Sequence, residues 1–178
     1  GGIDERNLSA YLVAPIGTKE YVCLDAGTVH SGIEKAIEKG TFSVPSSTVL
    51  RQYIKGYCIS HAHLDHVSGL IINSPADSTK TVYAIAPAMK MMQNHYFNDQ
   101  TWANFGDEGL GKPLKKYHFE TLSFAKTIPI SNTSMTVQAF PLSHVNPYES
   151  TAFLIKKDNN AILYLGDTGP DSVEKTTN

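Results

Sequence analysis

The chain has 178 residues, of which 41% are hydrophobic and 18% are charged, and its formal net charge is −2. This composition is that of a globular protein with a core, and it excludes an intrinsically disordered chain. The charge balance gives no support for binding to nucleic acid, and no apolar run is long enough to cross a membrane. We therefore expect a soluble protein, cytoplasmic or periplasmic, with no nucleic-acid or membrane partner.

Strands and helices are expected to alternate through the first hundred residues. A capping box of Ser31 and Glu34, followed by Gly40, marks the first helix, and a proline opens the last one. Cys23 and Cys58 fall inside two of the apolar runs, which favours buried free thiols over a disulfide. The expected strands lie at 9–14, 21–26, 57–60 and 81–86, and the expected helices at 31–40, 47–56, 66–74 and 87–97.

The second half of the chain is richer in strands. Residues 98–118 mix glycine, proline, aromatic and charged residues, and we interpret them as an irregular insertion that covers a pocket. Three strands are expected after it, at 135–144, 150–157 and 161–167, with a turn at 157–160 joining the last two. A strand-rich chain with interspersed helices favours an α/β sandwich over a barrel or a helical bundle.

The expected strand at 57–60 runs directly into the sequence HAHLDH. In an extended chain, side chains two positions apart point the same way, so His61, His63 and Asp65 should face one point. His66 begins the next helix and approaches from a second direction. Two directions of approach suit a pair of metal ions, and imidazole and carboxylate ligands suit zinc, manganese or iron. The alternative is a histidine cluster on a surface loop without a metal.

Two further strands end in residues of the metal-binding type. His144 ends one expected strand and Asp167 ends another, and functional residues gather at strand ends in layered α/β folds. Taken alone, His144 is equally well explained as a polar loop residue, and Asp167 is better explained as a turn former or a helix cap. Beside the histidine cluster, we interpret both as ligands.

The stretch HAHLDHVSGLIINSPAD, together with the opening GGIDERNLSAYLV and the segment LDAGT, resembles the class II cyclic-nucleotide phosphodiesterases of the metallo-β-lactamase superfamily. The resemblance implies an α/β fold, a metallo-β-lactamase-like αββα sandwich, and two divalent metal ions, with zinc ahead of manganese or iron. His61, His63 and His144 would hold the first ion, and Asp65 and His66 the second, with Asp167 bridging both and Asp25 supporting the site from behind. A turn residue ahead of Ala26 is an equally good explanation of Asp25.

One departure from the family concerns the second ion. The family carries a further metal-binding histidine beyond the Asp167 strand, and no histidine follows Asp167 here. We therefore expect residues 1–178 to form a single metallo-β-lactamase-like domain that is partial, incomplete at the C-terminus and, given the abrupt start at Gly1, at the N-terminus as well. A partner chain, as in a homodimer, is the alternative source of the missing ligand.

The resemblance also implies an enzyme. It would be a dinuclear metallohydrolase that converts a small-molecule 3′,5′-cyclic nucleotide, cAMP and also cGMP, to the 5′-monophosphate. A metal-bound hydroxide would attack phosphorus, and Asp65 would serve as a catalytic residue by orienting it. Protonation of the leaving oxygen has no assigned residue: His30, His95 and His118 are candidates, each better explained as an ordinary imidazole.

Contacts to the substrate are not assigned by the sequence. Trp102, Phe105, Tyr96, Tyr148 and Asn146 are candidates for the nucleobase, and most of them are better explained by packing. Two alternative functions remain open at this stage. One is another hydrolase of the same fold, such as a lactonase, a thioesterase or an RNA-processing nuclease, and the other is a metal-binding module without catalysis.

Overall fold

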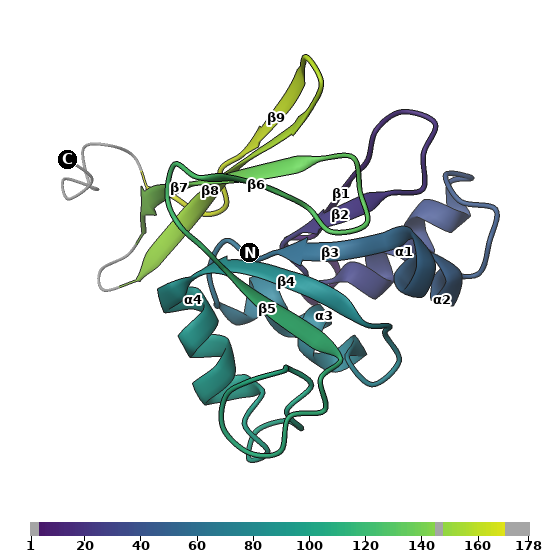
Figure 1. Cartoon of the computed structure of the whole chain (residues 1–178). Helices are drawn as coiled ribbons and strands as arrows, with labels where there is room; N and C mark the ends of the chain where they lie inside the picture. Colours follow the sequence, from purple (N-terminus) through teal and green to yellow (C-terminus); the bar gives the residue numbers. More distant parts are fainter. Residues whose placement is uncertain (1–3, 145–147, 170–178) are drawn as a thin grey trace.

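Two β-sheets face each other in the computed structural model, which describes residues 4–144 and 148–169 (Figure 1). The first sheet has five strands in the order β1-β2-β3-β4-β5, and the second has four in the order β6-β7-β8-β9. The strands of the first sheet are β1 (Tyr11–Val13), β2 (Tyr21–Leu24), β3 (Ile54–Cys58), β4 (Lys80–Ile85) and β5 (Tyr117–Leu122). Those of the second are β6 (Thr127–Pro129), β7 (Thr136–Ser143), β8 (Glu149–Lys157) and β9 (Asn160–Tyr164).

The helices follow from the way the strands of the first sheet are connected. Strands β2 to β5 are parallel, and parallel neighbours need a crossover that returns the chain to the same edge. The crossovers contain α1 (Val29–Glu38), α2 (Ser46–Thr48) with the π-helical turn η2 (Val49–Tyr53), α3 (Leu64–Asn73), and α4 (Ala86–Met91) with the π-helical turn η3 (Met92–Tyr96). A short 3-10 turn, η1 (Glu5–Asn7), precedes β1. Figure 1 shows these helices on the face of the first sheet that lies away from the second sheet.

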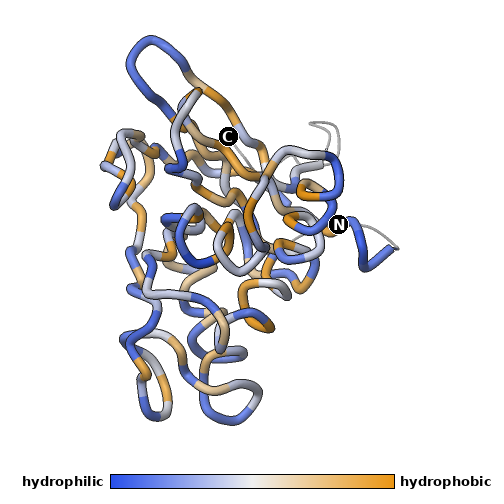
Figure 2. Tube along the Cα trace, turned by 90° about the vertical axis from the view of Figure 1, so that its right-hand side faces the viewer, coloured by the Kyte–Doolittle hydropathy of each residue, from blue (hydrophilic) through white to orange (hydrophobic). Residues whose placement is uncertain are grey.

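The core lies between the layers. Val82 and Tyr83 of β4 belong to the same buried hydrophobic cluster as Val137 of β7 and Phe153 of β8. Figure 2 shows the hydrophobic segments gathered inside the molecule and the hydrophilic ones at loop tips. Both cysteine thiols are free and buried, as expected. Within the described residues, no helix is long and apolar enough to cross a membrane.

The helix expected at 47–56 is shorter in the structure, and its last expected residues belong to β3 instead. Helical structure ends at Tyr53, and β3 already begins at Ile54, because Ile54 and the residues from Gly56 to Cys58 are buried in the sheet. A Cβ atom on Gly56 would lie 2.9 Å from the carbonyl oxygen of Thr81. Glycine therefore disfavours the helix here and allows β3 to approach β4 closely.

The segment 98–118 is irregular as expected, as far as the start of β5. Strands β5 and β6 were not predicted from the sequence. The contacts of the irregular segment are with the end of α3, away from the histidine cluster. Trp102 Nε1 donates to Ser74 Oγ (3.0 Å), and Lys116 Nζ donates to the Ser74 carbonyl oxygen (2.8 Å). Ser74 follows the last residue of α3, whereas the histidine cluster lies at the beginning of that helix. The segment therefore packs at the far end of α3.

A candidate metal centre between the two sheets

The loop after β3 carries the first group of candidate ligands. Ser60 and His61 are buried there, and His63 is the N-cap residue of α3. His61 Nε2 lies 3.0 Å from His63 Nδ1. The ring centroids of His61 and His63 lie 4.9 Å and 5.2 Å from that of His144, which follows β7. One ligand atom from each of the three imidazoles falls within 4.8 Å of the others, so the group has the size of a metal-binding site.

A second group shares His61 and adds His66 and Asp167, again with ligand atoms within 4.8 Å of one another. His66 Nε2 lies 3.4 Å from Asp167 Oδ1 and 3.5 Å from Asp65 Oδ2. We had expected Asp65 to continue the extended chain, but it lies in α3, which begins at Leu64. Its carboxylate therefore faces His66 rather than lining up with His61 and His63. All six residues expected as ligands nevertheless lie around the two groups.

Asp25 lies directly behind the second group. Its backbone is left-handed (φ 53°), a conformation that aspartate tolerates better than most residues. The backbone N–H of Asp25 donates to the Cys58 carbonyl oxygen (2.9 Å), and that of Ala26 to the His66 carbonyl oxygen (2.7 Å). These bonds hold the carboxylate of Asp25 against His66, whose Nδ1 lies 2.7 Å from Oδ2.

Electrostatics keep two imidazoles of the first group neutral. Burial, and to a smaller extent the positive charge that neighbouring histidines would carry, lowers the pKa of His61 to about 3. Burial and His144 also lower the pKa of His63. For His66, burial lowers the pKa, but the hydrogen bond that its Nδ1–H donates to Asp25 and the charges of Asp25, Asp167 and Asp65 outweigh burial and raise it. Neutral imidazoles retain the lone pair that a metal ion needs.

The side chains fit a divalent cation. His66 Nε2 is buried and makes no hydrogen bond within the part of the chain that the structure describes, although a buried polar atom normally has a partner. Imidazole nitrogens and carboxylate oxygens converge on it from both sheets. Zinc, manganese and iron take this set of donors, and no thiolate lies among them.

Several residues proposed from the sequence lie elsewhere. His118 pairs with Asp107. His30 Nε2 lies 3.7 Å from Glu34 Oε1 at an exposed position, on the wall of a groove that also reaches Asp65. His95 and Phe105 are in neither group of candidate ligands, and Trp102 bonds to the end of α3. Asn146 lies outside the described residues.

Two of the aromatic candidates do adjoin the centre. The Tyr148 ring lies 4.6 Å from that of His63, and Tyr96 donates to the Ala62 carbonyl oxygen (2.9 Å). Sequence reasoning missed Ser60 and Tyr164, which both bond to Asp25. Ser60 could have been considered because it directly precedes the histidines, and Tyr164 because it ends the strand that leads to Asp167.

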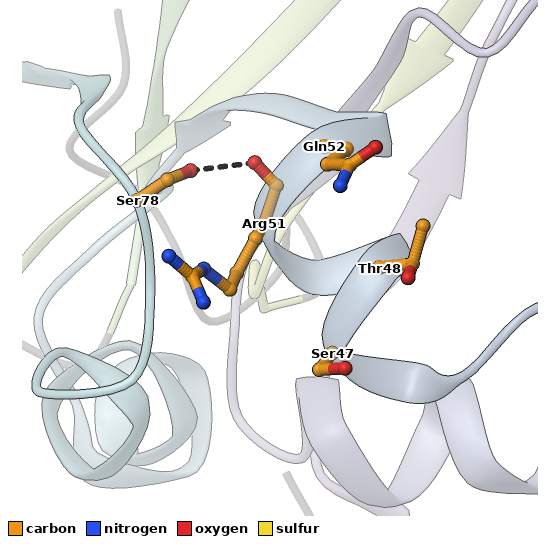
Figure 3. Close-up of a pocket in the computed structure, with 5 residues that line it drawn as sticks. All are labelled: Ser47, Thr48, Arg51, Gln52 and Ser78. Atoms are coloured by element: carbon orange, nitrogen blue, oxygen red, sulfur yellow. Dashed lines mark hydrogen bonds between the residues drawn. The ribbon is translucent and has the colours of Figure 1, made fainter.

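Cavities open on both sides of the centre. One of about 150 Å³ adjoins His61 and His63 and has an apolar wall of Pro87, Ala88 and Met91. A wider groove of about 630 Å³ runs between α1 and α3, from Asp65 to Ile72 and Asn73. A third pocket of about 370 Å³, shown in Figure 3, is lined by Ser47, Thr48, Arg51, Gln52 and Ser78. It lies at the turn that precedes β3, whereas the histidines follow that strand, so it does not belong to the centre.

Comparison with solved structures defines the class of fold. The metallo-β-lactamase fold protein YhfI from Bacillus subtilis superposes with a TM-score of 0.60, covering 93% of this chain and 57% of YhfI at 15% identity. Unliganded yeast PDE1 superposes with a TM-score of 0.81, covering 95% of this chain and 63% of PDE1 at 19% identity. The expected metallo-β-lactamase-like α/β fold is confirmed.

Within that fold, the sequence identifies a family. The chain belongs to the class-II cAMP phosphodiesterases, whose family model matches residues 1–178. A relative from Yersinia pestis, named "Probable 3',5'-cyclic-nucleotide phosphodiesterase", is 43% identical over 188 residues. The match covers 100% of this chain and 54% of the relative, so the chain spans about half the length of that protein.

Proposed function

We propose that the protein catalyses metal-dependent hydrolysis of a 3′,5′-cyclic nucleotide to the 5′-monophosphate, with cAMP as substrate and cGMP as a second one. The observation that carries the proposal is the convergence of His61, His63 and His144 beside His66 and Asp167, in a chain of this family. A cyclic phosphodiester fits such a centre because the phosphate is anionic and its hydrolysis develops charge on oxygen.

The two groups of side chains are proposed to hold two divalent cations, zinc by the donor set, with manganese or iron as alternatives. Bound there, the cations would lower the pKa of water and stabilise charge on the phosphoryl oxygens. Of the chain's own residues, His61, His63 and His144 would hold one cation, and His66 with Asp65 the other. Asp167 would lie between them, and its carboxylate is 35% exposed, so it is open to the substrate side.

Asp65 is proposed as the residue that orients the attacking water. Its carboxylate is 31% exposed and lies at the first turn of α3, where the positive end of the helix dipole stabilises the ionised form. The nucleoside part of the substrate is placed in the cavity of about 150 Å³, since apolar walls beside a few polar groups are typical of small-molecule sites. Tyr148 and Met91 border that cavity.

The test follows the conversion of cAMP to 5′-AMP by purified protein, as isolated, after chelation, and after adding back zinc or manganese. Chelation should abolish turnover and the added cation should restore it. His63→Ala should lower kcat/KM at least about hundredfold, whereas His118→Ala, which alters a histidine outside the centre, should retain the activity. Full activity in His63→Ala would contradict the proposal.

A substrate panel of lactones, thioesters and RNA 3′ ends would identify a different hydrolase on the same fold. Tight metal binding without turnover of any member would indicate a metal-binding module.

A further inference from the structure

The carboxylate of Asp25 is fully buried and surrounded by four hydrogen-bond donors. The Ser60 backbone N–H donates to Oδ1 (2.7 Å). Three more donors meet at Oδ2: Ser60 Oγ (2.7 Å), His66 Nδ1 (2.7 Å) and the hydroxyl of Tyr164 (2.6 Å). A buried carboxylate needs such bonds to remain ionised. These bonds hold the Asp25 carboxylate in place, and the carboxylate in turn orients the side chains that donate to it.

The bond to Asp25 determines which nitrogen of His66 faces the second group. Nδ1 lies against the carboxylate, so it carries the hydrogen, and the lone pair of neutral His66 is on Nε2. That nitrogen is the one that lies 3.4 Å from Asp167 Oδ1. A carboxylate behind a metal-binding imidazole commonly fixes both its tautomer and its ring orientation.

Ser60 extends the same control to the first group. Its hydroxyl has one hydrogen, which is donated to Asp25 Oδ2, so toward His61 Nδ1 (3.0 Å) the oxygen acts as an acceptor. His61 Nδ1 then carries a hydrogen, and the lone pair is on Nε2, the nitrogen that lies 3.0 Å from His63 Nδ1. Asp25 thus orients His66 directly and His61 through Ser60.

Tyr164 brings the second sheet into this arrangement. It is the last residue of β9, and its hydroxyl reaches Asp25, which follows β2, although the two are 139 positions apart in sequence. Its ring packs against that of Tyr11 on β1, with centroids 5.6 Å apart. Burial and the charge of Asp25 raise the pKa of the Tyr164 hydroxyl far above its ordinary value, so it stays a donor.

We propose that Ser60 and Tyr164 are positioning residues. Ser60 orients side chains in both groups of candidate ligands, whereas Tyr164 acts mainly on one group. Tyr164 acts mainly on the group that adds His66 and Asp167, because its hydroxyl donates to Asp25, which bonds directly to His66 but reaches His61 only through Ser60. Ser60 supports both groups, because its hydroxyl contacts Asp25 and His61. This inference rests on the proposed metal centre.

The test is a zinc titration of metal-free protein against a chromophoric chelator, without any substrate, for Tyr164→Phe, Ser60→Ala and the wild type. Tyr164→Phe should weaken the binding of one of two zinc ions about tenfold and that of the other clearly less, whereas Ser60→Ala should weaken the binding of both. Tyr11→Phe is the matched control, since it removes a hydroxyl from the neighbouring ring and should change neither. The visible spectrum of bound Co²⁺ should change in the same two variants and not in the control.

Wild-type affinity for both ions in Tyr164→Phe would overturn the role of Tyr164, and equal losses at both ions would also overturn it. Loss of only one ion in Ser60→Ala would overturn the role of Ser60. A wild-type protein that binds no zinc would overturn the proposed function, and the inference with it.

Discussion

Gly166 lies so close to Ser60 that a Cβ atom on Gly166 would stand 2.8 Å from the Cβ of Ser60 and 2.9 Å from its hydroxyl oxygen. Real Cβ atoms do not approach this closely, so Ser60 or Gly166 would have to move. Ser60 bonds to Asp25, and Gly166 directly precedes Asp167. The contact therefore sets the distance between side chains contributed by the two sheets.

Gly166→Ala should lower kcat/KM for cAMP about hundredfold, because displacement by roughly 1 Å has that effect on reacting groups. The backbone of Gly166 is also left-handed (φ +56°), which is unfavourable for alanine by itself. Gly17→Ala is the matched control, since Gly17 has φ +80° and nothing within 4 Å of an added Cβ. Steady-state kinetics and thermal melting of both variants give the comparison. Equal activity in the two would show that the contact with Ser60 is unimportant.

The proposed site of the nucleoside can be tested at its apolar wall. Met91→Glu places a charge in the cavity beside His61 and His63, and it should raise KM for cAMP about tenfold or more, since burying an unpaired charge is costly. Hydrolysis of bis(p-nitrophenyl) phosphate, which carries no nucleoside, should change little. Ile72→Glu introduces the same charge in the groove beside Asp65. A KM effect in Ile72→Glu and none in Met91→Glu would place the nucleoside in that groove.

Asp77 is expected to matter for stability rather than for metal binding. Tyr57 and Tyr117 donate to its Oδ2 (2.6 Å and 3.0 Å), and Lys80, which is also buried, pairs with Oδ1. Asp77→Ala leaves the Lys80 ammonium buried without its partner and should lower the free energy of unfolding by about 3–5 kcal/mol. Asp158→Asn removes the charge of an exposed ion pair with Lys157 at a left-handed position that asparagine tolerates, and should cost no more than about 1 kcal/mol. Urea denaturation measures both, and similar losses would argue against the importance of burial.

His118 should make stability depend on pH. Its hydrogen bond to Asp107 (2.5 Å), together with the charges of Asp107 and Glu120, raises its pKa above the ordinary 6.5. Because the pKa of His118 is higher in the folded state, the protonated imidazole stabilises the folded protein. This stabilisation is complete below about pH 6.5 and is lost as the pH rises through the folded-state pKa. His118→Gln should therefore lower the melting temperature more at about pH 5.5 than at about pH 9. The imidazole is 58% exposed, so the effect is small, under about 1 kcal/mol. In an Asp107→Asn background, the pH difference should become smaller, with only the part due to Glu120 remaining.

The sequence predicted which candidate ligands come together better than it predicted their local geometry. HAHLDH is dense enough to be recognised within one segment, and His144 and Asp167 follow strands, β7 and β9, that are clearly patterned. The start of α3 was placed two residues late, because the apolar periodicity becomes evident only after Asp65. Because of that error, Asp65 was expected to face the same point as His61 and His63. In the structure it lies in the first turn of α3, and its carboxylate faces His66.

The hydrogen bonds behind the ligands could not be predicted. Tyr164 and Asp25 meet only because β9 and β2 belong to sheets that face each other, and neither residue has a local pattern that indicates the contact. Strand β5 was missed for a related reason. Its buried positions Tyr117, Phe119 and Leu122 alternate with polar ones only in part, and the irregular segment before it obscures the boundary.

Under the proposed function, the division of the candidate ligands between two sheets would couple cation supply to the folding equilibrium. His61 and His66 follow β3, whereas His144 and Asp167 come from the other layer, so a chain with separated layers has no complete set of ligands. A cation that binds only the assembled form stabilises it by mass action, by about 2.7 kcal/mol per site at a concentration one hundred times the dissociation constant. Under the proposed function, scarcity of the metal would lower the amount of native protein as well as its turnover.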